Sequence, residues 1–140
     1  RSRIGYPGSD AEKEIIRRPR LGHPADALAP VLTAADVLDL QKRVHEVRVD
    51  EALLAYIVEI VSETRRSGAI EMGVSPRGSV SLYRAAQALA LVEGRDFVTP
   101  DDIKEIALPV LAHRLVLKTA SGPTAGLILE EILQRVEVPV

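Results

Sequence analysis

The stretch from Gly73 to Leu117, GVSPRGSVSLYRAAQALALVEGRDFVTPDDIKEIALPVLAHRLVL, decides the fold. It contains two helix starts, Ser75-Pro76 and Thr99-Pro100. Ser and Thr are preferred N-cap residues, and proline is tolerated at the first helical position because its missing N–H would have no partner there. We expect the first of these helices to continue to Glu93 and to end at Gly94, the residue type that most often follows a helix.

Apolar residues at helical spacing predict further helices on both sides of this stretch. One begins at Thr33, in the capping-box pattern Thr33-Ala34-Ala35-Asp36, and another covers about residues 50–65. The helix after Thr99 is expected to be interrupted at Pro109, with residues 110–117 forming a further short turn or helix. A last helix is expected over about 124–135. Because no sustained strand alternation occurs, the predicted fold is all-α, a compact bundle of four to five helices.

Residues 1–32 are expected to form a separate connector. They include one short helix over about 9–18, which Pro19 ends, and a stretch rich in proline and glycine. The bundle is then residues 33–140. The chain begins with Arg1 and its single methionine is Met72, so we expect it to be a fragment of a larger protein.

Composition excludes several classes of function. The 140 residues are 46% hydrophobic and 27% charged, as in a folded soluble domain, and the net charge of −2 predicts neither nucleic-acid nor membrane binding. No apolar run approaches the ~20 residues of a membrane span. The absence of cysteine excludes disulfides and thiolate sites and is compatible with the cytoplasmic location that we expect.

Arg77 is the residue most indicative of a ligand. It occupies the second position of a predicted helix, where a cation opposes the helix dipole and costs about a few tenths of a kcal/mol. The free N–H groups of a first helical turn already favour an anion, so an added arginine suggests phosphate binding. Gly78 costs about 1 kcal/mol relative to Ala inside a helix, but it would let a ligand or another backbone approach. An exposed arginine that tolerates its position is the alternative.

Other chemistry has weaker support in the sequence. The pattern from Gly73 to Ser79 lacks the lysine and the preceding strand of a P-loop. The three histidines have no metal-ligand spacing, and no metal site is predicted. The acidic pair Asp101-Asp102 fits helix capping better than metal binding. The dipeptide His113-Arg114 fits a surface pair better than a partner site, and Tyr6-Pro7 could line a nucleotide base pocket.

The region from Gly73 to Leu117 resembles the lid of MoxR-family AAA+ ATPases. That family shows G-A-S-P-R-A, then E-G-R-x-x-V-x-P-x-D-[IV], then P-[VL]-L-x-H-R-[LI], and the three motifs correspond in order to residues 73–78, 93–103 and 109–115. The start of the chain resembles the segment after the last strand of the ATPase core, and residues 33–65 resemble the first lid helices. The part after Leu117 matches least well. The family usually has Ala where this chain has Gly78, which should soften the helix start.

The resemblance implies a specific role for Arg77, that of the sensor 2 arginine that contacts the γ-phosphate of ATP. It also implies Mg-ATP as cofactor, bound mainly by a core domain that this chain lacks, with Tyr6 and Pro7 as further nucleotide contacts. Without the Walker A, Walker B and sensor 1 residues, the chain alone should not hydrolyse ATP. Implied partners are its own AAA+ core domain, a homo-oligomeric ring and a von Willebrand factor A-type protein, in chaperone-like assembly of client complexes.

Two other functions stay open at this stage. A stand-alone helical interaction module would explain the apolar helices without a catalytic core. A DNA-binding helical domain is the third reading, and the net charge of −2 with no continuous basic face weighs against it.

Overall fold

The computed structural model describes residues 5–17, 28–119 and 121–139. It divides into two compact units, Arg1–Val37 and Leu38–Val140. In the first unit α1 (Ser9–Arg17) follows Gly8, whose carbonyl accepts the Glu12 N–H at 3.0 Å. The predicted stop at Pro19 and most of the proline-rich connector lie outside the described residues.

The second unit is an α-helical bundle, as predicted. Its elements are the end of α2 (Ala34–Glu46), α3 (Glu51–Arg66), β1 (Ile70–Met72), α4 (Pro76–Val92), α5 (Pro100–Leu111), the 3₁₀ turn η2 (Ala112–Arg114), β2 (Val116–Leu117) and α6 (Ala125–Arg135). None of the helices in the described ranges combines the length and apolar character that a bilayer span requires.

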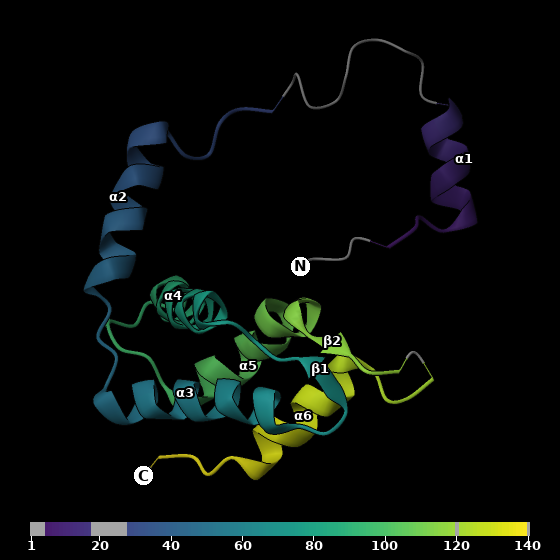
Figure 1. Cartoon of the computed structure of the whole chain (residues 1–140). Helices are drawn as coiled ribbons and strands as arrows, with labels where there is room; N and C mark the ends of the chain where they lie inside the picture. The colour runs from purple at the N-terminus through teal and green to yellow at the C-terminus, as the bar shows by residue number, and fades with distance from the viewer. Residues whose placement is uncertain (1–4, 18–27, 120, 140) are drawn as a thin grey trace. The chain divides into compact units, whose positions relative to one another are not determined.

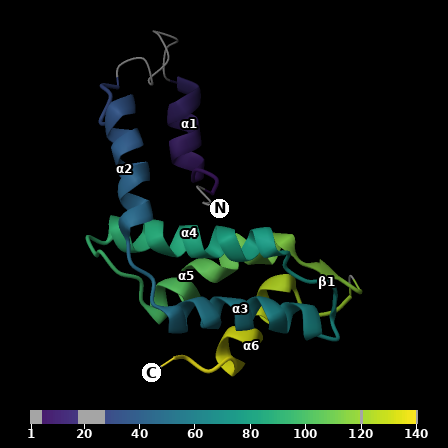
Figure 2. The same ribbon diagram turned by 60° about the vertical axis from the view of Figure 1, so that its left-hand side comes forward.

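The core of the bundle lies where α3, α4, α5 and α6 meet. In Figure 2, α4 lies above α5 and α3, and α6 closes the opposite side. Each of these helices contributes side chains with no exposed surface: Ile60, Leu82, Ile103, Leu111 and Leu129. Burying a side chain of this size stabilises the fold by about 1.5–3 kcal/mol, so these residues hold the long helices in fixed positions.

The predicted helix caps are present. Thr99 and Asp102 form a capping box: the Asp102 carboxylate accepts the Thr99 N–H at 2.7 Å, and the Thr99 hydroxyl accepts the Asp102 N–H at 3.4 Å. Thr33 and Asp36 do the same at the start of α2. Gly94 has φ +77°, the left-handed conformation that follows a helix end.

The prediction that Pro109 interrupts its helix is wrong. α5 continues to Leu111, with Pro109 inside its last turn. Proline removes one backbone hydrogen bond, and near a helix end little of the helix remains to be lost. Ala107 and Leu111 on either side are completely buried, so packing holds this turn helical.

A small two-stranded sheet joins the α3–α4 connection to the chain after η2. β1 pairs antiparallel with β2, with Ile70 opposite Leu117, and the Lys118 N–H donates to the Ala69 carbonyl at 3.1 Å. Figure 1 shows this sheet beside the start of α4, which carries Arg77. The sheet therefore ties the loop before α4 to the chain after α5.

The segment between α2 and α3 is short, and hydrogen bonds join it to the bundle. Arg48 donates its N–H to the Asp96 carbonyl at 2.9 Å and accepts the Val98 N–H at 3.0 Å. The buried side chain of Gln87 donates to the Val47 carbonyl at 2.7 Å. α4 thus holds the point where the chain enters the bundle.

Candidate functional site

Arg77 lies at the second position of α4, exposed at the surface. The N-cap residue is Ser75 and the first helical residue is Pro76, as predicted, but the Ser75 side chain makes no capping hydrogen bond. The first turn of α4 contains no acidic residue. The positive end of this helix therefore carries an additional cation, and none of the groups that usually neutralise such an end.

The residue before this helix start, Val74, is fixed by the last turn of α3. The Thr64 hydroxyl accepts the Val74 N–H at 3.0 Å and donates to the Val61 carbonyl at 2.6 Å. Arg65 donates its Nε–H to the Val74 carbonyl at 2.8 Å. Both backbone polar groups of Val74 are thus bound by α3 side chains, which fixes where α4 begins. Sequence reasoning missed Thr64 and Arg65; a buried threonine near a helix end was the one available signal.

Gly73 allows this close approach. A Cβ at Gly73 would lie 2.8 Å from both Cα and Cγ of Arg65, closer than side chains pack. Any larger residue would push the loop away from α3 and move the start of α4.

Gly78 is explained by packing and not by an open approach to a ligand. The residue is buried, and a Cβ there would lie 2.2 Å from Cγ1 of Val74 and 3.6 Å from Cδ of Arg114. The contact with Arg114 would be an ordinary one, whereas the distance to Val74 is far shorter than side chains allow. The missing side chain therefore accommodates Val74.

The second family motif, residues 93–103, contains a cluster of ion pairs and hydrogen bonds that has a structural role. The Arg95 guanidinium binds both carboxylate oxygens of Asp102, at 2.5 and 2.7 Å, and also the Glu93 carboxylate and the Phe97 carbonyl. Burial raises the pKa of Asp102, but the hydrogen bonds from Arg95 and Thr99 outweigh it and hold that pKa below its usual value. Hydrogen bonds to Asp102 and then Glu93 raise the pKa of Arg95. This cluster orders the α4–α5 connection, and its opposite charges neutralise one another.

The other predicted site residues belong to different parts of the described chain. Tyr6 and Pro7 lie in the first unit, where both are exposed, and their contact with a nucleotide base stays a prediction. The side chain of His45 contacts Arg84, and His113 is exposed. Over residues 5–17, 28–119 and 121–139, no three His, Asp or Glu side chains form a group that could hold a metal ion.

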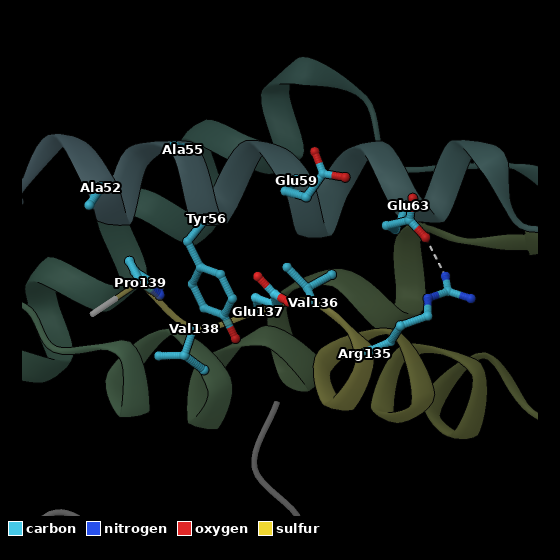
Figure 3. A pocket seen from close by; sticks show the side chains of 10 residues that line it. All are labelled: Ala52, Ala55, Tyr56, Glu59, Glu63, Arg135, Val136, Glu137, Val138 and Pro139. Atoms are coloured by element: carbon cyan, nitrogen blue, oxygen red, sulfur yellow. Dashed lines mark hydrogen bonds and ion pairs between the residues drawn. The ribbon is translucent and has the colours of Figure 1, made fainter.

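An open groove of about 730 Å³ lies away from Arg77, between α3 and the segment that follows α6. Figure 3 shows its two walls: Tyr56 and Glu59 project from α3, and Glu137 and Val138 from the C-terminal segment. The Tyr56 hydroxyl is buried and has no hydrogen-bond partner among the described residues, and burial raises its pKa. Glu63 pairs with Arg66 and Arg135 at one end. The cationic end of this groove is therefore already neutralised, and it does not resemble a phosphate site.

Comparison with known proteins agrees with this geometry. The AAA lid domain family matches residues 62–134. The uncharacterized protein YeaC of Bacillus subtilis is 43% identical over 99% of this chain and 44% of its own length. Chaperone MoxR1 of Mycobacterium tuberculosis is 36% identical over 97% of this chain and 39% of its own length.

A solved structure has the same fold. The crystal structure of a "putative ATPase" from Cytophaga hutchinsonii aligns with 98% of this chain at a TM-score of 0.80 and 29% identity, and 45% of that protein is covered. The chain thus spans less than half the length of each of these three proteins.

Proposed function

This chain is an AAA lid domain of the MoxR type, and we propose that it covers the nucleotide of an AAA+ ATPase and couples ATP hydrolysis to lid position. The observation that carries the proposal is the position of Arg77, an exposed arginine at the positive end of α4. The loop before this helix is held by α3, and no carboxylate among the described residues lies in ion-pair range of Arg77. A guanidinium that is not paired with a carboxylate is suited to a phosphate, which it can bind through two parallel hydrogen bonds.

Arg77 acts on charge that develops during phosphoryl transfer. Bound Mg-ATP supplies the bond that is broken, and Arg77 stabilises negative charge on the transferred group. α4 packs along α5, and its Gln87 side chain donates a hydrogen bond to the Val47 carbonyl. A shift of the start of α4 therefore moves the rest of the bundle with it. The resulting change reaches the segment that joins the bundle to α2.

We further propose that the ATP-binding residues, with the Walker motifs, lie in a core domain that is not part of this sequence, and that the chain by itself does not hydrolyse ATP. We propose a homo-oligomeric ring in the cytoplasm, acting in chaperone-like assembly with a von Willebrand factor A-type protein. One relative, MoxR1, is named a chaperone.

ATP hydrolysis by the complete protein that carries this lid tests the proposal. Arg77→Ala is expected to lower kcat about 100-fold with little change in KM, the usual cost of removing one preorganised donor to a transition state. Arg77→Lys should recover part of the loss. The matched control is Arg135→Ala, which removes an exposed arginine that pairs with Glu63. Equal kcat values for Arg77→Ala and the control would refute the assignment.

A stand-alone interaction module remains the second candidate because of an apolar groove between α3 and α4. Its lining includes Val58 and Val80, 57% and 60% exposed, together with Leu54 and Tyr83. Partner binding that is lost in Val58→Asp, in a protein whose ATPase activity does not respond to Arg77→Ala, would favour this function instead.

A further inference from the structure

Arg114 is a second arginine held against the start of α4. It ends the 3₁₀ turn after α5, and its Nε–H donates to the Val110 carbonyl at 2.9 Å. Its stem lies beside Gly78, where a Cβ would make an ordinary van der Waals contact with Cδ of Arg114 at 3.6 Å. The position of Arg114 thus depends on contacts with both α5 and α4.

A hydrogen-bonded chain connects Arg114 to the helical turn of Arg77. The Arg114 Nη2 donates to the Ser81 hydroxyl at 3.4 Å, and that hydroxyl donates to the Arg77 carbonyl at 2.9 Å. Residues 77 and 81 are four apart and share one face of the helix. Ser81 therefore places the second guanidinium on the face of α4 that Arg77 occupies.

Neither arginine is neutralised by an acid in the region that the structure describes. Four other arginines of the bundle pair with carboxylates (Arg48, Arg66, Arg95 and Arg135), whereas Arg65 binds the Val74 carbonyl and Arg84 contacts His45. Of the five N–H donors of Arg114, only Nε and one on Nη2 have partners among the described residues. Two like charges on one helix face repel each other when no counter-charge is present, and an anionic ligand reduces that cost.

We propose that Arg114 is a second phosphate-contacting residue of the nucleotide site, acting beside Arg77. This inference rests on the proposed function. The guanidinium is held in place by Val110 and Ser81, and we assign it to a phosphate that ATP and ADP share, so its contribution is the same in the ground state and the transition state. Arg114 thus strengthens nucleotide binding, whereas Arg77 accelerates hydrolysis.

The test uses the complete ATPase that carries this lid, with ATP as the probe. Arg114→Met keeps an unbranched stem beside Gly78 and removes the charge, and Arg114→Lys restores a charge. Arg135→Met is the matched control because it makes the same change at a paired arginine. Arg114→Met is expected to raise KM for ATP and Kd for ADP about 10-fold, the value of one charge-assisted hydrogen bond, with kcat within about 2-fold of wild type. Arg114→Lys should recover part of the affinity, and all unfolding midpoints should match the control.

The outcomes separate this inference from the proposed function. Unchanged KM and Kd in Arg114→Met would overturn the phosphate contact of Arg114, even if Arg77→Ala still abolished hydrolysis. Weakened nucleotide binding in Arg114→Met with full activity in Arg77→Ala would support Arg114 and refute the role of Arg77. A lowered unfolding midpoint in Arg114→Met, with no rescue of affinity by lysine, would make Arg114 a packing residue and overturn the inference.

Discussion

Val74 and Gly78 form a packed pair whose substitutions should not be additive. Val74 is completely buried, and a Cβ at Gly78 would lie 2.2 Å from its Cγ1. The MoxR-type motif G-A-S-P-R-A has alanine at both positions, where this chain has valine and glycine. The pair can therefore be tested by a double-mutant cycle.

The structure sets the expected size of each effect. Gly78→Ala gains about 1 kcal/mol of helix propensity but overpacks the site by about 2 kcal/mol, for a net loss of about 1 kcal/mol. Val74→Ala removes two buried methyl groups and costs about 2 kcal/mol. In the double variant the steric conflict disappears and the helix gain remains, so the total loss should be about 1 kcal/mol and not the additive value of about 3 kcal/mol.

Urea denaturation of the four proteins, followed by far-ultraviolet circular dichroism, measures these free energies of unfolding. A coupling of about 2 kcal/mol in favour of the double variant is expected. Additive losses within about 0.5 kcal/mol would show that Val74 and Gly78 do not compete for the same space, and the packing explanation of Gly78 would be wrong.

Three further predictions concern the supports of the α4 helix. Thr64→Val leaves the buried Val74 N–H without an acceptor and should cost about 1–3 kcal/mol in urea unfolding, whereas a cost below about 0.5 kcal/mol would contradict the clamp. The hydrogen bonds that lower the pKa of Asp102 stabilise the fold above the unfolded-state value of about 3.9 and are lost as pH falls through the lower native value. Asp102→Asn should therefore reduce stability at pH 7 and flatten its acid dependence, and an unchanged acid slope would argue against the ion pair between Arg95 and Asp102. Gly94→Ala should lower the free energy of unfolding by about 1 kcal/mol because φ is +77° there. An unchanged midpoint of thermal unfolding would show that α4 does not end at this residue.

The helices were predictable because their ends carry local signals. Thr99, Pro100 and Asp102 lie within four residues of one another, and the capping box they suggest is present. The small sheet was not predictable, since strands of three and two residues are too short to show alternation. The course of α5 through Pro109 depends on burial of Leu111, which is a property of the tertiary structure.

The candidate site was predictable only in part. Arg77 could be predicted as a candidate phosphate contact because a cation at a helix start opposes the helix dipole, and this argument needs only the local sequence. Its supports were not visible in this way, because Thr64 contacts Val74 across ten residues of chain and Arg114 contacts Ser81 across 33. Gly78 indicated a close approach, but the approaching group, Val74, was identified only by the fold.

The claim that Arg77 stabilises transferring phosphate is tested most directly by affinity for a transition-state mimic. In the complete protein, the affinity for Mg-ADP with aluminium fluoride is compared with that for Mg-ADP alone, in wild type and in Arg77→Ala. The wild type should bind the mimic more tightly than ADP, and Arg77→Ala should lose about 100-fold of that preference while keeping its affinity for ADP. An equal preference in the two proteins would show that Arg77 does not contact the transferred group and would contradict the account.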